Sequence, residues 1–131
     1  MMYLVDTHVL LWTFINPKKL SFNVSQLFNN KNSVFYYSPI NLWEISIKYG
    51  LKKIDLKGIT PEDFFCEVTN SFYICKNINN NDLITSYKLP IYHKDPFNRF
   101  LIWEAIRNDF TLISADARMD LYKKEGLRVV H

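Results

Sequence analysis

Residues 1–14 read MMYLVDTHVLLWTF and join a short apolar strand to a helix through an acidic residue. Tyr3 to Val5 has the apolar character of a buried strand, and Thr7 can cap a helix that begins near His8. Asp6 therefore comes at the carboxyl end of a strand, the edge at which open α/β sheets bind ligands. Aspartate also caps helices and turns, so Asp6 alone leaves a purely structural role open.

The rest of the chain alternates short strands with helices. Strands are predicted over 33–37, 72–75, 111–114 and 127–130, and helices over 8–15, 21–28, 38–49, 61–70, 79–87, 97–108 and 116–124. This alternation is typical of parallel strands with helices on both faces. We therefore expect a three-layer α/β fold with a mostly parallel sheet of about four or five strands.

The length and composition indicate one globular domain over residues 1–131, with 48% hydrophobic residues. The longest nearly apolar run, 9–15, is too short to span a membrane, and no basic segment precedes it as in a secretory signal, so we expect a cytoplasmic protein. The formal charge of +3 permits a nucleic-acid partner without requiring one. Cys66 and Cys75 lack metal-site spacing, which favours buried free thiols.

Glu44 interrupts an apolar stripe on one helix. Ile40, Glu44, Ile47 and Leu51 share one helix face by their spacing. A buried carboxylate without a partner costs several kcal/mol or takes up a proton, so a cation is expected beside Glu44. The alternative is a partly exposed Glu44 paired with Lys48 one turn later, which is worth about 0.3–0.5 kcal/mol.

Two further acidic positions and an amide follow later in the chain. Asp95 precedes Pro96, the pattern of a helix N-cap with proline at the first helical position, so a plain cap remains one interpretation. Asn98 lies in the first turn of that helix, and its side-chain oxygen can bind a cation or cap locally. Asp116 follows the strand 111–114 and so comes at the same sheet edge as Asp6, where it could also cap the last helix.

Asp6, Glu44, Asn98 and Asp116 are thus four oxygen donors on separate elements, all expected at one edge of the sheet. Carboxylates gathered there repel one another unless a divalent cation neutralises them. Oxygen ligands with few histidines favour Mg²⁺ or Mn²⁺ over Zn²⁺. Such a cation suits phosphodiester hydrolysis, because it activates a water, polarises the phosphoryl oxygen and stabilises the leaving oxygen.

Four segments, in order along the chain, resemble the motifs of PIN-domain ribonucleases, and within them the VapC-type toxins of bacterial toxin–antitoxin pairs. The segments are LVDTHVLLW (4–12), SPINLWEI (38–45), HKDPFNR (93–99) and LISAD (112–116). The resemblance implies a Mg²⁺- or Mn²⁺-dependent endoribonuclease that cuts RNA, such as tRNA or ribosomal RNA, with a metal-activated water. It also implies a homodimer and a cognate VapB-type antitoxin that blocks the acidic pocket.

By this resemblance, Asp6, Glu44 and Asp116 fall on the metal-binding acids of the family. Asn98 falls where the family usually has aspartate, in an Asp-Pro-Phe-Asp-Arg motif. Asparagine keeps a ligating oxygen but lacks the charge, so we expect weaker metal binding, which Asp95, one turn earlier, would partly offset.

Other residues are expected around this site. Thr7 would supply a hydroxyl to it, and Ser114 is a weaker candidate for the same role. Arg99 would hold an RNA phosphate or pair with an antitoxin carboxylate, the alternative being an exposed arginine without a partner. His8 and His93 are interpreted as hydrogen-bonded structural residues, because a metal-activated water needs no general base. Three tryptophans are interpreted as core or dimer packing, with base stacking as the alternative: Trp12, Trp43 and Trp103.

Two other functions remain open from the sequence. The first is a binding module that has lost catalysis with the fourth carboxylate and only engages RNA or an antitoxin. The second is a phosphatase with an aspartate nucleophile, which is disfavoured because such enzymes typically carry a second aspartate two residues later, where this chain has His8.

Overall fold

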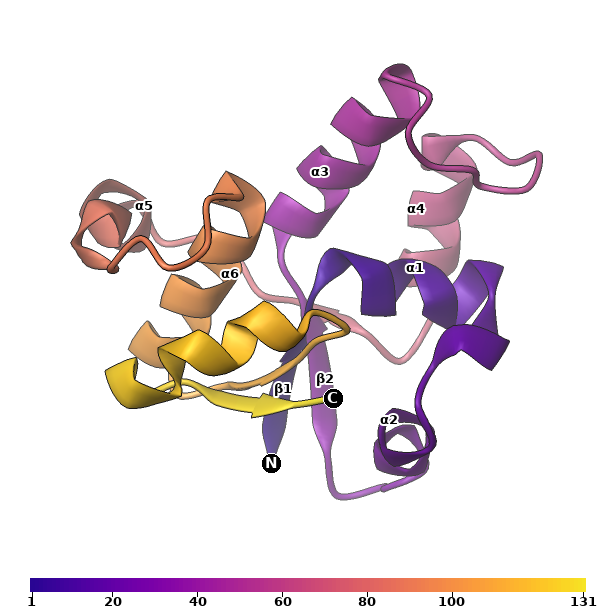
Figure 1. Cartoon of the computed structure of the whole chain (residues 1–131). Coiled ribbons are helices and arrows are strands. Elements are labelled where there is room, and N and C mark those ends of the chain that lie inside the picture. The colour runs from indigo at the N-terminus through magenta and orange to yellow at the C-terminus, as the bar shows by residue number, and fades with distance from the viewer.

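The computed structural model describes residues 1–131 and contains a five-stranded, all-parallel sheet of order β3-β2-β1-β4-β5 (Figure 1). The strands are β1 (Met2–Val5), β2 (Val34–Tyr37), β3 (Ile74–Cys75), β4 (Thr111–Ile113) and β5 (Arg128–Val130). The α-helices are α1 (Thr7–Ile15), α2 (Phe22–Phe28), α3 (Pro39–Gly50), α4 (Pro61–Thr69), α5 (Asn80–Thr85) and α6 (Pro96–Arg107). The 3₁₀ helices are η1 (Pro17–Lys19), η2 (Ser86–Lys88) and η3 (Ala117–Glu125). The expected three-layer α/β fold is confirmed.

Strand β1 lies at the centre of the sheet and is buried on both faces. Leu4 pairs with Tyr36 of β2 and Leu112 of β4. Because side chains alternate across a strand, Val5 and Leu4 enter different hydrophobic cores, and both are fully buried. This two-sided burial explains the continuous apolar run in the sequence of a central parallel strand.

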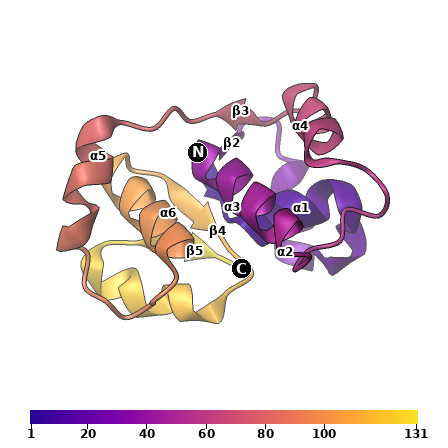
Figure 2. The same ribbon diagram turned by 90° about the horizontal axis from the view of Figure 1, so that it is seen from above.

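The two cores lie on opposite faces of the sheet. Helices α1, α2 and α4 cover one core, while α6 and η3 cover the other. Figure 2 shows these two groups of helices on either side of the strands, with α3 between α6 and α1. Helix α3 contributes Ile45 to the first core and Ile40 to the second. None of the helices has both the length and the apolar composition needed to cross a bilayer.

Several local expectations differ from the structure. Asp6, and not Thr7, caps α1, because its Oδ1 accepts a hydrogen bond from the Val9 N–H at 2.9 Å. The helix expected over 79–87 divides into α5 and η2, and the helix expected over 116–124 is the 3₁₀ helix η3. Cys66 and Cys75 are free but exposed, since one lies on the outer side of α4 and the other on the short edge strand β3.

Candidate active site

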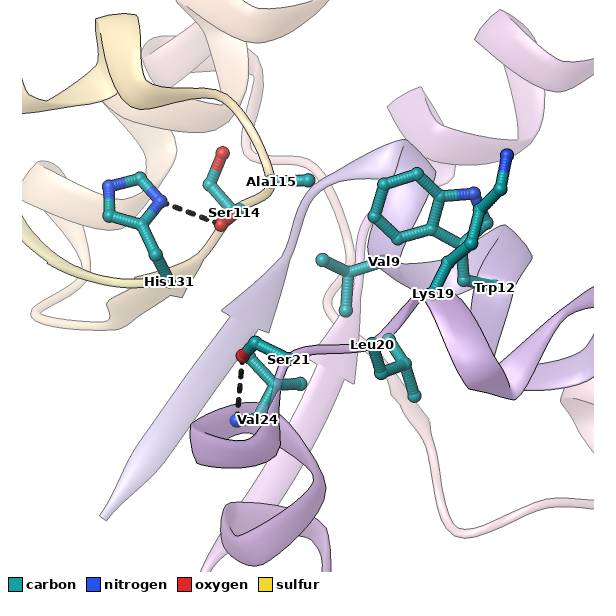
Figure 3. Close-up of a pocket in the computed structure, with 9 residues that line it drawn as sticks. All are labelled: Val9, Trp12, Lys19, Leu20, Ser21, Val24, Ser114, Ala115 and His131. Carbon is teal, nitrogen blue, oxygen red and sulfur yellow. Dashed lines mark hydrogen bonds between the residues drawn. The ribbon is translucent and has the colours of Figure 1, made fainter.

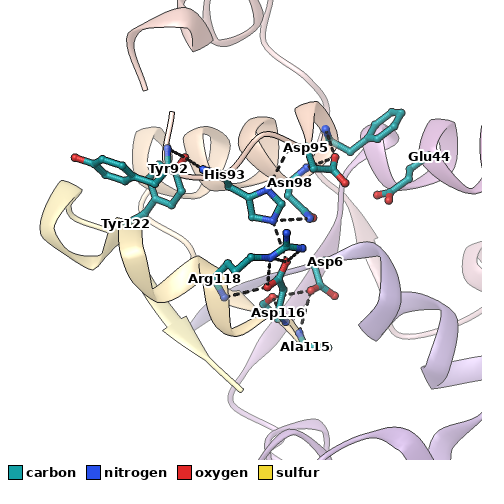
Figure 4. A network of polar contacts seen from close by, with 12 residues as sticks. Asp6, Glu44, Tyr92, His93, Asp95, Asn98, Ala115, Asp116, Arg118 and Tyr122 are labelled. Atoms are coloured by element: carbon teal, nitrogen blue, oxygen red, sulfur yellow. Dashed lines mark hydrogen bonds and ion pairs between the residues drawn. The ribbon is translucent and has the colours of Figure 1, made fainter. Parts of the chain in front are cut away.

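One hollow at the carboxyl edge of the sheet gathers the oxygen donors that the sequence predicts. It has a volume of about 390 Å³, and we name it the acid pocket after five of its lining residues: Asp6, Glu44, Asp95, Asn98 and Asp116. The connection after β1, helix α3, the start of α6 and the connection after β4 each contribute to it. Because parallel strands end at the same edge, residues up to 110 positions apart meet there (Figure 4).

Asp6 is held rigidly at the base of the acid pocket. It is 2% exposed, and its Oδ2 accepts hydrogen bonds from Ser114 Oγ at 2.7 Å and from the Ala115 N–H at 3.0 Å. Burial raises the pKa of Asp6 although these hydrogen bonds act in the opposite direction. None of the ion pairs of the chain includes Asp6, so its carboxylate charge lacks a close cation.

Glu44 is buried and also bonded to a lysine. Its side chain is 3% exposed, Thr7 Oγ1 donates to its Oε1 at 2.5 Å, and Lys48 forms an ion pair with its Oε2. The Asn41 amide in turn donates to Thr7 Oγ1 at 3.1 Å and to the Val5 carbonyl oxygen at 3.3 Å. The Thr7 hydroxyl therefore orients the Glu44 carboxylate through this hydrogen bond, and Thr7 does not itself line the acid pocket.

Asp116 is held by two cationic or polar side chains. Arg118 Nη2 donates to Asp116 Oδ2 at 2.8 Å, and His93 Nε2 lies 2.9 Å from the same oxygen. His93 Nδ1 accepts the Asp95 N–H at 3.1 Å, which leaves the ring proton on Nε2 for donation to Asp116. Burial alone would raise the pKa of Asp116, but the bonds from Arg118 and His93 hold that pKa well below its usual range.

Asp95 has the capping role that the sequence leaves open, and it also lines the acid pocket. Its Oδ1 accepts the Phe97 N–H at 2.8 Å and the Asn98 N–H at 3.3 Å. Arg99, by contrast, is not brought to the acid pocket. Its guanidinium donates to the carbonyl oxygens of Leu89 and Pro90, at 3.0 Å each.

The family model of the PIN domain matches residues 3–125 of this chain. The chain belongs to the PIN domain family. Among solved structures, this PIN domain is similar to VapBC2 from Rickettsia felis, which was determined bound to a DNA fragment from its promoter. The TM-score is 0.70 and the sequence identity is 18%, and the match covers 99% of this chain and 98% of that chain. It is also similar to VapBC-1 from nontypeable Haemophilus influenzae, at a TM-score of 0.65 and 18% identity over 99% of this chain and 97% of that chain. At 18% identity, this structural similarity shows the fold alone. A search of curated proteins gave no match.

The donor chemistry of this PIN domain suits a hard divalent cation. The acid pocket offers carboxylate and amide oxygens, which Mg²⁺ and Mn²⁺ prefer, and it contains a buried carboxylate, Asp6, without a paired cation. In the present arrangement, no three acidic, histidine or cysteine side chains converge closely enough to hold an ion. Figure 4 shows why: Glu44 lies apart from Asp6 and Asp116, and Arg118 lies over Asp116. Lys48 and Arg118 thus occupy carboxylate oxygens of Glu44 and Asp116 that a bound cation would use.

Some residues of the PIN domain site were not predicted as functional from the sequence. Arg118 follows Asp116 by two positions, and this spacing matches no sequence motif that would have indicated a function. Asn41 stands at the third position of α3, where a capping box usually has glutamate or glutamine, so the signal for its capping bond to Ser38 was present. Its bonds to Val5 and Thr7 required the tertiary structure.

Proposed function

We propose that this PIN domain is a metal-dependent endoribonuclease of the VapC toxin type, which hydrolyses RNA phosphodiester bonds. The observation that supports this proposal is the acid pocket, where four carboxylates and the Asn98 amide, brought together from four parts of the chain, line one hollow. PIN domains are generally nucleases, so family membership supports the same class of reaction.

In this proposal, Asp6, Glu44 and Asp116 hold Mg²⁺ or Mn²⁺, with Asn98 and Asp95 as the flanking oxygen donors. When bound, the cation supplies an activated water and stabilises the charge on the phosphoryl and leaving oxygens. The chain contributes orientation: Ser114 and Ala115 hold Asp6, and Thr7 holds Glu44.

The two cations of the acid pocket have a second role in this proposal. Lys48 and Arg118 both line the pocket, and each pairs with one of its carboxylates. Once metal neutralises those carboxylates, the two side chains are free to bind phosphate oxygens of the RNA. We therefore assign phosphate binding to Arg118 rather than to Arg99, whose guanidinium is engaged by the Leu89 and Pro90 carbonyl oxygens.

The partners proposed are a VapB-type antitoxin and a second copy of the chain. Both structures compared above are described as VapBC, which supports a toxin–antitoxin pairing here. Helix α3 and the residue that caps its C-terminus expose large apolar side chains, with Trp43 59% and Leu51 60% exposed, and these support a further protein contact. Light scattering of the purified chain, alone and with the antitoxin, tests both assemblies.

Cleavage of a mixed tRNA and ribosomal RNA pool tests the activity. The purified chain is titrated with Mg²⁺ and Mn²⁺. Addition of EDTA and the Asp6→Ala variant are the two controls in which no cleavage is expected. Asp109→Asn is a matched control, because Asp109 is 85% exposed and its φ of 61° is one that asparagine tolerates. Discrete fragments that disappear with EDTA and with Asp6→Ala, but persist with Asp109→Asn, are expected.

A binding module without catalysis is the second candidate. It is favoured by the asparagine at position 98 and by the pairing of Glu44 and Asp116 with cations of the chain itself. Folded, antitoxin-free protein that binds RNA but leaves it intact at every metal concentration would establish this alternative.

A further inference from the structure

A second hollow adjoins the acid pocket and has no part in the proposed cleavage (Figure 3). It has a volume of about 310 Å³, and we name it the Trp12 hollow. Its apolar lining comes from Val9, Leu20 and Val24, while Trp12 and Lys19 lie across from His131. Trp12 and Ala115 line both hollows, so the Trp12 hollow opens beside the carboxylates.

Trp12 is exposed on several sides. It is only partly buried on α1, and it lines the acid pocket, the Trp12 hollow and a third hollow of about 320 Å³ next to His8 and Lys57. Trp103 differs, since its indole N–H donates to Thr85 Oγ1 at 3.3 Å. Within the chain, Lys19 Nζ lies over the Trp12 ring and the His8 ring lies tilted at 5.7 Å from it. The parts of the indole that line the three hollows remain open for a ligand.

The Trp12 hollow itself suits an anionic ligand, because its lining includes Lys19 and no acidic side chain. Lys19 Nζ lies 5.7 Å from the centre of the Trp12 ring, and Lys18 and Lys57 are also exposed nearby in η1 and beside the third hollow. Aromatic rings flanked by lysines are the common means by which proteins bind single-stranded nucleic acid, because bases stack on the ring while the cations contact phosphates.

We propose that the Trp12 hollow binds an unpaired nucleobase of the RNA strand whose backbone passes through the acid pocket. Trp12 supplies the stacking surface and Lys19 contacts a flanking phosphate. This inference deepens the proposed function and rests on it, because it names the part of the RNA substrate that lies beside the cleaved bond. The continuity with the acid pocket and the lysines favour a nucleotide over an apolar side chain of a protein partner.

The test compares two strands of equal charge, first in Ca²⁺ and then in EDTA. Ca²⁺ takes carboxylate oxygens as ligands and so neutralises the acid pocket, and gel analysis after each measurement confirms that the strands are intact. One is a fluorescein-labelled oligouridylate of about ten residues, and the other is the same ribose-phosphate strand without bases. Fluorescence anisotropy with the wild-type chain should show tighter binding of the oligouridylate. Trp12→Leu should weaken that binding by about 5- to 150-fold and leave the abasic strand unaffected, while Trp12→Phe should retain most of the difference.

A direct readout comes from a chain carrying Trp43→Phe and Trp103→Phe, in which Trp12 is the single indole. Its fluorescence should be quenched by the oligouridylate and not by the abasic strand, and this result does not depend on whether Trp12→Leu folds. Tyr87→Leu is the matched control for loss of an exposed aromatic side chain, since Tyr87 is 76% exposed and lies on η2, away from both hollows.

Each contrary outcome overturns the nucleobase site separately from the nuclease proposal. Equal binding of both strands, absence of quenching, or an equal loss of both strands in Trp12→Leu would show that no base occupies the Trp12 hollow, even if RNA is cleaved. Loss of antitoxin binding alone in Trp12→Leu would assign the hollow to a protein partner. Base-dependent quenching without any cleavage would retain the nucleobase site and reject the nuclease.

Discussion

At the scale of the residue, Glu104 on α6 is a fully buried carboxyl group, and few polar or charged partners offset the free-energy cost of its burial. Neither of its oxygens makes a hydrogen bond, and the nearest cation, Lys76 Nζ, is 3.6 Å from Oε2. Burial raises the pKa of Glu104 to about 7, from an ordinary value of 4.5. The folded chain therefore keeps a proton that the unfolded chain releases in this window, so stability falls as pH rises from 4.5 through about 7.

Glu104→Gln should remove this loss of stability. Near neutral pH and above, the variant should have a free energy of unfolding greater than that of the wild type by up to about 3 kcal/mol, with little difference at acidic pH. Urea unfolding at about pH 5 and about pH 8 measures both values. The exposed Glu62→Gln on α4 is the control, and an identical pH dependence in wild type and Glu104→Gln would contradict the expectation.

Asn98 is the residue at which this chain departs from the motif it resembles. Its amide nitrogen lies 3.3 Å from His93 Nε2, which is bonded to Asp116. A carboxylate at position 98 would therefore lie close to the carboxylate of Asp116. Asn98→Asp should lower the Mn²⁺ concentration needed for half-maximal binding and cleavage by about tenfold, because a full charge replaces a dipole. Calorimetric titration with Mn²⁺ measures this; Asn32→Asp, in an exposed loop, is the control. An unchanged or raised requirement would show that residue 98 is not a ligand.

At the scale of the element, η3 connects the acid pocket to the loop that precedes α6. It begins after Asp116 and carries Tyr122, whose buried hydroxyl accepts the N–H groups of Tyr92 and His93, both at 2.9 Å, and donates to the Pro90 carbonyl oxygen at 2.8 Å. This hydroxyl thus fixes the backbone from which His93 reaches Asp116.

Tyr122→Phe should cost about 1–3 kcal/mol, because it leaves buried backbone donors without a partner. The amides of Tyr92 and His93 should exchange with solvent faster, and urea unfolding together with hydrogen exchange measures both effects. Tyr87→Phe, at an exposed site on η2, should change neither. Unchanged exchange at His93 in Tyr122→Phe would mean that the hydroxyl does not hold this loop.

At the scale of the whole molecule, the acid pocket joins elements from both cores, so a cation bound there should stabilise the entire fold. A ligand that binds the folded chain alone adds about 2.7 kcal/mol at a hundred times its dissociation constant. Thermal unfolding should therefore shift upward with Mn²⁺ in the wild type and in Asp109→Asn, but not in Asp6→Asn. An equal shift in all three would place the bound ion outside the acid pocket.

The sequence alone predicted the fold because its signals are local. The apolar run Tyr3 to Val5, the Ser38-Pro39 helix start and the acids after β1 and β4 depend on neighbours within a few residues. Since parallel strands end at one edge, these local signals also predicted that Asp6 and Asp116 would meet. The predicted boundaries of strands and helices were less accurate where a tertiary contact decided them, as at the two-residue edge strand β3.

Only the tertiary structure decided which partners the side chains of the site take. Whether Arg99 or Arg118 reaches the acid pocket depends on which carbonyl or carboxylate oxygens lie within the length of each side chain after the loops close. The same holds for Trp12, which lines three hollows together with residues far away in the sequence, among them Lys57 and Ala115. Sequence periodicity places a residue on a face of an element, whereas the distances between elements are fixed by the packing of the two cores.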